Sequence, residues 1–214
     1  MSFAGWPAEA LDFYDGLEAD NSKAYWTAHK AVYEEMVLGP MTELLEELAP
    51  DFGEGRVFRP YRDIRFSKDK SPYKTHIAAT LGVGYIQLSA EGLAAGSGMY
   101  GMAPDQLDRF RRAVASDGPG PDLERIIAGI ERQGIGVHGR DLLKTAPRGY
   151  PADHPRIGLL RYKGLVAWQH WPVEPWLGTR AARERVAGFL TASLPLREWL
   201  AKHVGESAAD VPGR

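Results

Sequence analysis

Cysteine is absent from the 214 residues of the chain. Its absence excludes disulfide bonds, thiolate nucleophiles, zinc ribbons and cysteine-ligated iron–sulfur clusters. A large excess of one charge is lacking as well, because 26 Lys and Arg residues stand against 28 Asp and Glu residues, for a net charge of -2. The chain therefore has no global field that attracts nucleic acid or an anionic membrane, and such a partner would need a local basic patch.

Long hydrophobic runs are also missing. No stretch approaches the roughly 18 apolar residues that span a bilayer, and the N-terminus, Met1–Pro7, lacks the basic and then apolar regions of a signal peptide. We therefore expect a cytoplasmic protein with no membrane partner. The small, polar residues 205–214 predict a flexible tail.

The order of the periodic segments predicts an α+β fold. Helical spacing is found over Pro7–Leu17, after the Asp20–Ser22 cap, from Pro40 onward, and over Thr179–Leu200, restarted at Pro195. Between them lie two alternating segments, Thr75–Leu81 and Tyr85–Ser89, and a further predicted strand, Leu93–Met99, joined by links of turn length. We expect one domain over residues 1–214, ordered over about 8–200, with a central antiparallel, meander-like sheet packed by N-terminal and C-terminal helices.

The segment Arg59–Lys74 departs most from the background. It contains six cations and two acids, a local charge of six minus two, or +4: Arg59, Arg62, Arg65, Lys68, Lys70, Lys74, Asp63 and Asp69. Two strands around Pro60 are predicted within Val57–Phe66, with Ile64 and Phe66 on one face, followed by a donor-rich loop over Ser67–Pro72. Guanidinium and ammonium groups at this density suit phosphate, sulfate or carboxylate oxygens, although two acids nearby could also neutralise them in a structural network.

A second basic cluster comes later in the chain. Pro147 and Gly149 indicate a constrained turn that presents Arg148. Pro155 can start a short helix, which would place His154 near its N-terminus, where an anion is favoured. Lys144, Arg161 and Lys163 complete the cluster. We expect Arg148 and Arg161 to close the anion site formed by the first segment.

These residues together resemble an uncharacterised bacterial and fungal family, domain of unknown function 2461. The matching pieces are Asn21–Trp26 with His29-Lys30 and Tyr33, Arg62–Lys74, Lys144 with Pro147–Gly149, Asp153–Pro155 and Leu159–Arg161. The resemblance covers about Phe13–Leu200 and implies a single α+β domain. The family usually has two Asn residues where this chain has Asn21-Ser22. The resemblance implies no established activity.

Motifs for metals and cofactors are weak. No pair of histidines has the H-x-x-x-H or H-E-x-x-H spacing, and we predict no metal site. The G-x-G-x-x-G pattern of Gly96–Gly101 lies at the end of a predicted antiparallel strand and lacks the helix that a dinucleotide site needs, so the cofactor stays unknown. The candidates for proton transfer are His29, Asp63 and His154.

Three functions remain open at this stage. The leading hypothesis is a site on the sheet surface for a phosphate-bearing or other anionic small molecule, and we leave open whether the protein is also an enzyme that acts on it. Its anion contacts would be Arg62, Arg65, Lys68, Lys70, Lys74, Arg148 and Arg161. The second is a nucleic-acid or protein interaction module that uses residues 59–74 with Tyr61, Phe66 and Tyr73. The third is a structural scaffold whose charges pair internally.

Overall fold

The computed structural model of the chain describes residues 2–82 and 84–208. Two compact units are present: unit 1 is Met1–Ala95 with His170–Leu190, and unit 2 is Gly96–Gln169 with Thr191–Arg214. Two strands and the last helix contribute residues to both units. The single domain over residues 1–214 that the sequence suggests stays a prediction.

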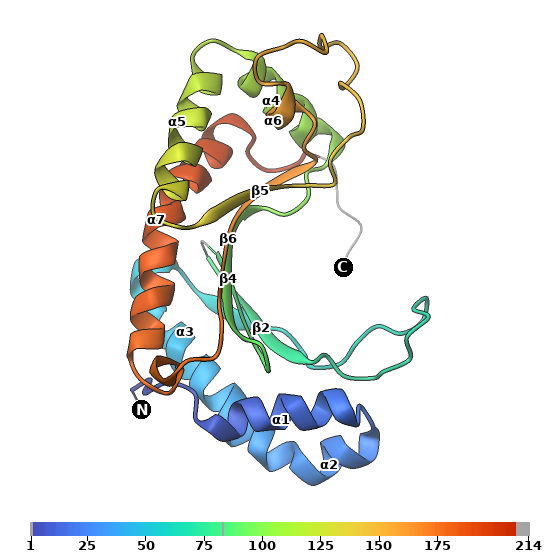
Figure 1. Cartoon of the computed structure of the whole chain (residues 1–214), viewed down its shortest axis with the longest axis vertical. Helices are drawn as coiled ribbons and strands as arrows, with labels where there is room; N and C mark the ends of the chain where they lie inside the picture. The colour runs from blue at the N-terminus through green and yellow to red at the C-terminus, as the bar shows by residue number, and fades with distance from the viewer. Residues whose placement is uncertain (1, 83, 209–214) are drawn as a thin grey trace. The chain divides into compact units, whose positions relative to one another are not determined.

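The described residues form a six-stranded sheet in the order β1-β2-β3-β4-β6-β5 (Figure 1). The strands are β1 Gly55–Val57, β2 His76–Leu81, β3 Gly84–Ser89, β4 Gly92–Met99, β5 Gly136–Arg140 and β6 Gly164–Trp171. The pairs β1–β2, β2–β3 and β5–β6 are antiparallel. The first four strands are neighbours in chain order, which confirms the predicted α+β fold with a meander-like sheet.

The helices of unit 1 come mainly from the N-terminal quarter of the chain. They are α1 Ala8–Ala19, α2 Lys23–Val32, the π-helical turn η1 Tyr33–Leu38 and α3 Gly39–Phe52, followed much later by the 3-10 helix η2 Pro175–Gly178. Ser22 caps α2 as predicted, because its Oγ accepts a hydrogen bond from the Tyr25 backbone N–H at 3.1 Å. Pro40 lies in the first turn of α3, where no backbone donor is needed.

The helices of unit 2 are α4 Pro104–Ala115, α5 Pro119–Glu131 and the single turn α6 Ile157–Leu160. The long helix α7, Ala181–His203, begins in unit 1 and ends in unit 2. It continues through Pro195, so the predicted restart at this proline is not a break in the helix. No helix of the described chain is long and apolar enough to cross a membrane.

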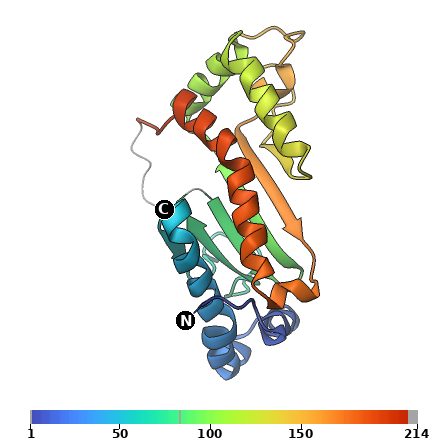
Figure 2. The same ribbon diagram turned by 90° about the vertical axis from the view of Figure 1, so that its left-hand side faces the viewer.

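The two faces of strands β1–β3 differ sharply in polarity. Ile77, Ala79, Ile86 and Leu88 are buried, and α3 packs against β1 and β2. Figure 2 shows α3 lying over one side of these strands. The opposite face, which we call the polar face, carries the partly or fully exposed residues Arg56, Phe58, His76, Thr80, Tyr85 and Gln87.

The basic segment does not have the predicted strands. Strand β1 ends at Val57, and only an isolated bridge between Tyr61 and Tyr73 follows before β2. The expected alternation over residues 57–66 is therefore wrong, and Phe66 is 95% exposed instead of sharing an inward face with Ile64. Among residues 58–75, only Tyr61 and Tyr73 pair as in a sheet, so this segment forms a long loop.

The start of the predicted flexible tail is held in place. The Arg109 side chain donates hydrogen bonds to the Val204 and Glu206 carbonyls, and Asp105 accepts from the Ser207 hydroxyl at 2.7 Å and the Ala208 N–H at 2.9 Å. Residues 205–208 are thus tied to α4, whereas the predicted tail residues 209–214 lie outside the described residues.

Candidate functional site

The basic loop, residues 62–72, is closed at its base by backbone hydrogen bonds. The Arg62 N–H donates to the Pro72 carbonyl at 2.9 Å, and the Lys74 N–H donates to the Pro60 carbonyl at 2.8 Å. Tyr61 and Tyr73 face each other as an isolated antiparallel bridge. These bonds turn the segment into a hairpin-shaped loop, which extends away from the sheet in Figure 1.

Helix α2 and the residue before its cap hold this base against unit 1. The Tyr73 ring stacks on Trp26 with ring centroids 4.3 Å apart and planes 5° apart, and both rings are buried. The Asn21 side chain donates to the Tyr73 carbonyl and accepts from the Tyr73 N–H, both at 3.1 Å. Asn21 belongs to one of the segments on which the family resemblance rests, and its side-chain amide anchors the base of the basic loop.

The two acids of the loop neutralise two of its arginines. Arg65 donates to Asp63 through Nε at 2.9 Å and Nη2 at 2.7 Å, and Arg62 forms an ion pair with Asp69. The side-chain hydrogen bond from Arg65 lowers the pKa of Asp63 to about 2. Hydrogen bonds from Ser71 first, and from Arg62 next, hold the pKa of Asp69 below its ordinary range. These pairs are the arrangement that the scaffold hypothesis expects.

The two lysines of the loop differ in their surroundings. Lys70 donates through Nζ to the Ile64 carbonyl at 3.0 Å, which closes the tip of the loop. Lys68 is exposed and has neither an ion pair nor a hydrogen bond in the described part of the chain. Phe66 stands at the same tip with the Arg65 guanidinium 5.9 Å from its ring centre. The loop thus presents an aromatic ring among cations.

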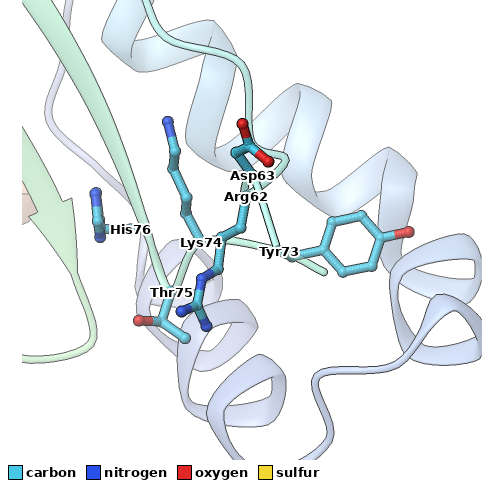
Figure 3. Close-up of a pocket in the computed structure, with 6 residues that line it drawn as sticks. All are labelled: Arg62, Asp63, Tyr73, Lys74, Thr75 and His76. Atoms are coloured by element: carbon cyan, nitrogen blue, oxygen red, sulfur yellow. The ribbon is translucent and has the colours of Figure 1, made fainter. Parts of the chain in front are cut away.

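An open hollow of about 500 Å³ lies where the loop meets β2. Its lining is Arg62, Asp63, Tyr73, Lys74, Thr75 and His76, drawn in Figure 3. Lys74 and His76 are two residues apart, and in Figure 3 their side chains lie on the side of the chain away from the Thr75 side chain. In Figure 3 the Tyr73 ring points away from Lys74, toward the helices. The basic lining is therefore supplied by Arg62, Lys74 and His76.

Lys74 is the cation least compensated within this hollow. In the described part of the chain no carboxylate lies within 4 Å of its ammonium group, which instead lies 5.5 Å from the centre of the Phe58 ring. Partial removal from water, and then the nearby Arg59, lower the pKa of Lys74. Burial, and then the charge of Lys74, lower the pKa of His76. An anion placed between these two side chains would relieve both effects.

The three candidates for proton transfer occupy different surroundings. His29 stacks on Tyr25 with ring centroids 4.0 Å apart, and its Nδ1 donates to the Tyr25 carbonyl at 2.9 Å. Asp63 lines the hollow but is held by Arg65. His154, in unit 2, accepts a hydrogen bond from the Arg156 N–H through Nδ1 at 3.0 Å. The hollow thus has Asp63 among its lining residues, but neither His29 nor His154, and a catalytic role for the three stays a prediction.

The later basic cluster lies in unit 2. Arg161 donates to the Leu143 and Lys144 carbonyls at 2.6 and 3.0 Å, which ties the loop before α6 to its end. Arg148 is exposed, with no ion pair or hydrogen bond among the described residues. The expectation that Arg148 and Arg161 close the site of the first segment stays a prediction.

Two residues with clear structural roles, His76 and Arg156, were not among the site residues predicted from the sequence. His76 lines the hollow, and the alternation of β2 puts it on the same face as Thr80, opposite the buried Ile77 and Ala79. Arg156 caps the end of α4, donating to the Val114 carbonyl at 2.6 Å and the Ala115 carbonyl at 3.1 Å. No spacing rule links Arg156 to α4, because the two are about 40 residues apart in the chain.

Metal chemistry has no cluster to support it in the residues that the structure describes. Among them, no three His, Asp or Glu side chains come together in a way that could hold a metal ion. The side chains that line the hollow are those of Arg62, Lys74 and His76 together with the Asp63 carboxylate, the Thr75 hydroxyl group and the Tyr73 ring.

The comparisons with known proteins identify a family and no activity. A family model described as Conserved hypothetical protein (DUF2461) matches residues 9–199. Neither the curated proteins nor the solved structures contain a match to the chain. The matched range includes the basic loop, the hollow and the later basic cluster.

Proposed function

We propose that this chain, which belongs to the conserved hypothetical protein family DUF2461, binds a small phosphate-bearing anion in the hollow between the basic loop and β2. Lys74 is the principal contact, and His76 supplies a further donor. The observation that carries the proposal is the partly buried Lys74 ammonium group, which has no carboxylate partner among the described residues.

The charges near the hollow support an anion over a neutral ligand. Arg59 is close enough to lower the pKa of Lys74, and Lys74 lowers that of His76. A cluster of like charges in partial burial costs free energy that an anionic ligand recovers. Arg62 keeps its Asp69 partner, and its guanidinium points away from the Lys74 ammonium group in Figure 3, so Arg62 forms part of the wall of the hollow.

Titration with inorganic phosphate, followed by NMR of the His76 ring and by calorimetry, tests the proposal. Lys74→Met keeps the apolar stem over Phe58 and removes the charge, so we expect phosphate affinity to fall about tenfold or more, as for a lost charge-assisted hydrogen bond. The matched control is Lys23→Met on α2, an exposed lysine with no ion pair in the described chain, which should leave affinity unchanged.

Two results would overturn the proposal. One is the absence of any change in the His76 signals as phosphate is added. The other is equal weakening by Lys74→Met and Lys23→Met, which would indicate attraction by net charge and no defined site.

A second candidate function rests on the exposed aromatic side chains of the segment. Phe66 is 95% and Tyr61 51% exposed, and both adjoin arginines, a combination that binds single-stranded nucleic acid through stacking and phosphate contacts. Oligonucleotide affinity that falls steeply with salt, and that is lost in Phe66→Ala, would favour this function. A shallow salt dependence with phosphate alone would favour the small-anion site.

A further inference from the structure

The polar face of the sheet continues directly from the hollow as an aromatic shelf, which we define as Phe58 and Tyr85. Their ring centroids are 6.4 Å apart with planes inclined by 37°. The Phe58 N–H donates to the Ala78 carbonyl at 2.8 Å, which fixes the residue beside β2, and Tyr85 pairs with Thr80 across β2–β3. Phe58 is 38% exposed, so the shelf is accessible to a ligand.

Lys74 connects the shelf to the hollow. Its ammonium group lies 5.5 Å from the centre of the Phe58 ring and also lines the hollow. A ligand whose anionic group contacts Lys74 is therefore within reach of the Phe58 ring. Aromatic faces bind planar, polarisable groups by offset stacking.

Gln87 adds a directional polar group beside the shelf. The Tyr85 hydroxyl donates to Gln87 Oε1 at 2.7 Å. The Gln87 carboxamide oxygen accepts this hydrogen bond, and its NH₂ group can donate to a ligand. A carboxamide beside an aromatic face is suited to the edge of a nitrogen heterocycle, whose ring nitrogens and carbonyls accept hydrogen bonds.

We infer that the ligand of the proposed anion site is a mononucleotide, with its phosphate at Lys74 and His76 and its base stacked on Phe58 and Tyr85 beside Gln87. This inference rests on the proposed function, because the phosphate position is that of the proposed site. It adds the class of ligand, which the hollow alone does not determine.

A ligand series separates the two claims. The probes are inorganic phosphate, ribose 5-phosphate, adenosine and adenosine 5′-monophosphate, titrated into the full chain. Base stacking on an aromatic side chain predicts that the mononucleotide binds about tenfold or more tightly than ribose 5-phosphate. Phe58→Leu should remove that advantage and leave the affinity for inorganic phosphate unchanged, whereas Phe58→Trp should keep it. Phe66→Leu, an aromatic residue outside the shelf, is the matched control.

The outcomes are distinguishable. Equal affinities for ribose 5-phosphate and the mononucleotide, or a base preference that survives Phe58→Leu, would overturn the nucleotide inference while the anion site stands. Adenosine binding as tightly as its monophosphate, with no effect of Lys74→Met, would overturn the anion site. Tight binding of oligonucleotides alone, with a steep salt dependence, would replace both claims by nucleic-acid binding. Circular dichroism of each variant checks that a loss of binding is not a loss of folding.

Discussion

Asn21 and Tyr73 form a two-way pair in which one side chain satisfies both backbone polar groups of the other residue, each hydrogen bond being 3.1 Å long. Tyr73 is 5% exposed, and burial makes an unsatisfied backbone group costly. Since Tyr73 directly follows the basic loop and precedes Lys74, this pair fixes where the loop meets the hollow.

Replacing Asn21 with alanine should therefore loosen the loop. Losing two partly buried hydrogen bonds should lower the free energy of unfolding by about 1–3 kcal/mol, measured by urea denaturation. Hydrogen exchange at the Tyr73 amide should become faster. Asn21→Asp keeps the acceptor for this amide but loses the donor to the carbonyl, so the amide should stay more protected than in Asn21→Ala. Unchanged exchange at Tyr73 in both variants would contradict the assigned role of the pair.

The two lysines of the loop should respond differently to substitution. Lys70 closes the tip through the Ile64 carbonyl, so Lys70→Ala should make amide exchange faster over residues 64–70. Lys68→Ala removes an exposed charge that no ion pair holds among the described residues, and should leave exchange and the melting temperature unchanged. If both variants lowered stability alike, the scaffold hypothesis would extend to Lys68 as well.

Anion affinity should depend on pH through His76. Burial, and then the charge of Lys74, lower the pKa of His76 from its ordinary value, so the ring gains its proton only as the solution becomes more acidic. A bound anion favours the protonated ring, so affinity should rise about twofold to fivefold with falling pH. Sulfate is the probe, because it keeps its double charge over this range. His76→Gln should flatten the profile, and His138→Gln on β5 should not; a profile that persists in His76→Gln would contradict the assignment.

The sheet could be predicted because β2 and β3 alternate in polarity and because β2, β3 and β4 are joined by short turns. Residues 57–66 did not follow this rule. Ile64 and Phe66 alternate with Asp63 and Arg65, but the segment forms a loop that contains the Tyr61–Tyr73 bridge and the ion pair of Arg65 with Asp63. Alternation records only which side chains can share a face, whereas a strand also needs a neighbouring backbone to pair with.

The cations of the site were predictable as a group, but their individual roles were not. The charge density of Arg59–Lys74 predicts either an anion site or an ion-pair network, and the structure has both paired and unpaired cations: Arg65 is paired with Asp63, and Lys74 has no acid within 4 Å among the described residues. The difference depends on which side chain reaches an acid two to seven residues away. Phe58 follows the end of β1, and His76 is the first residue of β2. The pairing of these two strands brings the two residues to the same region of the sheet, and this pairing cannot be read from the composition of the segment.

Glu47 should contribute a stability that disappears in acid. It accepts hydrogen bonds from the Ser2 hydroxyl at 2.8 Å, the Phe3 N–H at 2.8 Å and the Arg180 guanidinium at 3.0 Å, which joins the N-terminal segment, α3 and the start of α7 within unit 1. The side-chain hydrogen bond from Arg180, followed by that from Ser2, lowers the pKa of Glu47 from 4.5 to about 2.

A carboxylate whose pKa is lower in the folded state stabilises the fold above its unfolded pKa, so this contribution should be complete above pH 4.5 and be lost as the pH falls toward about 2. Glu47→Gln should cost on the order of 1–2 kcal/mol near pH 7, since solvent screens a cluster at the surface, and should cost progressively less in acid. Glu46→Gln, on the exposed side of α3, is the control and should show no such convergence. Urea denaturation of the unmodified chain and both variants, from neutral to acid pH, measures the free energy of unfolding. If the difference in this free energy between Glu47→Gln and the unmodified chain did not change with pH, the charge of Glu47 would not be what stabilises its contacts with Ser2, Phe3 and Arg180.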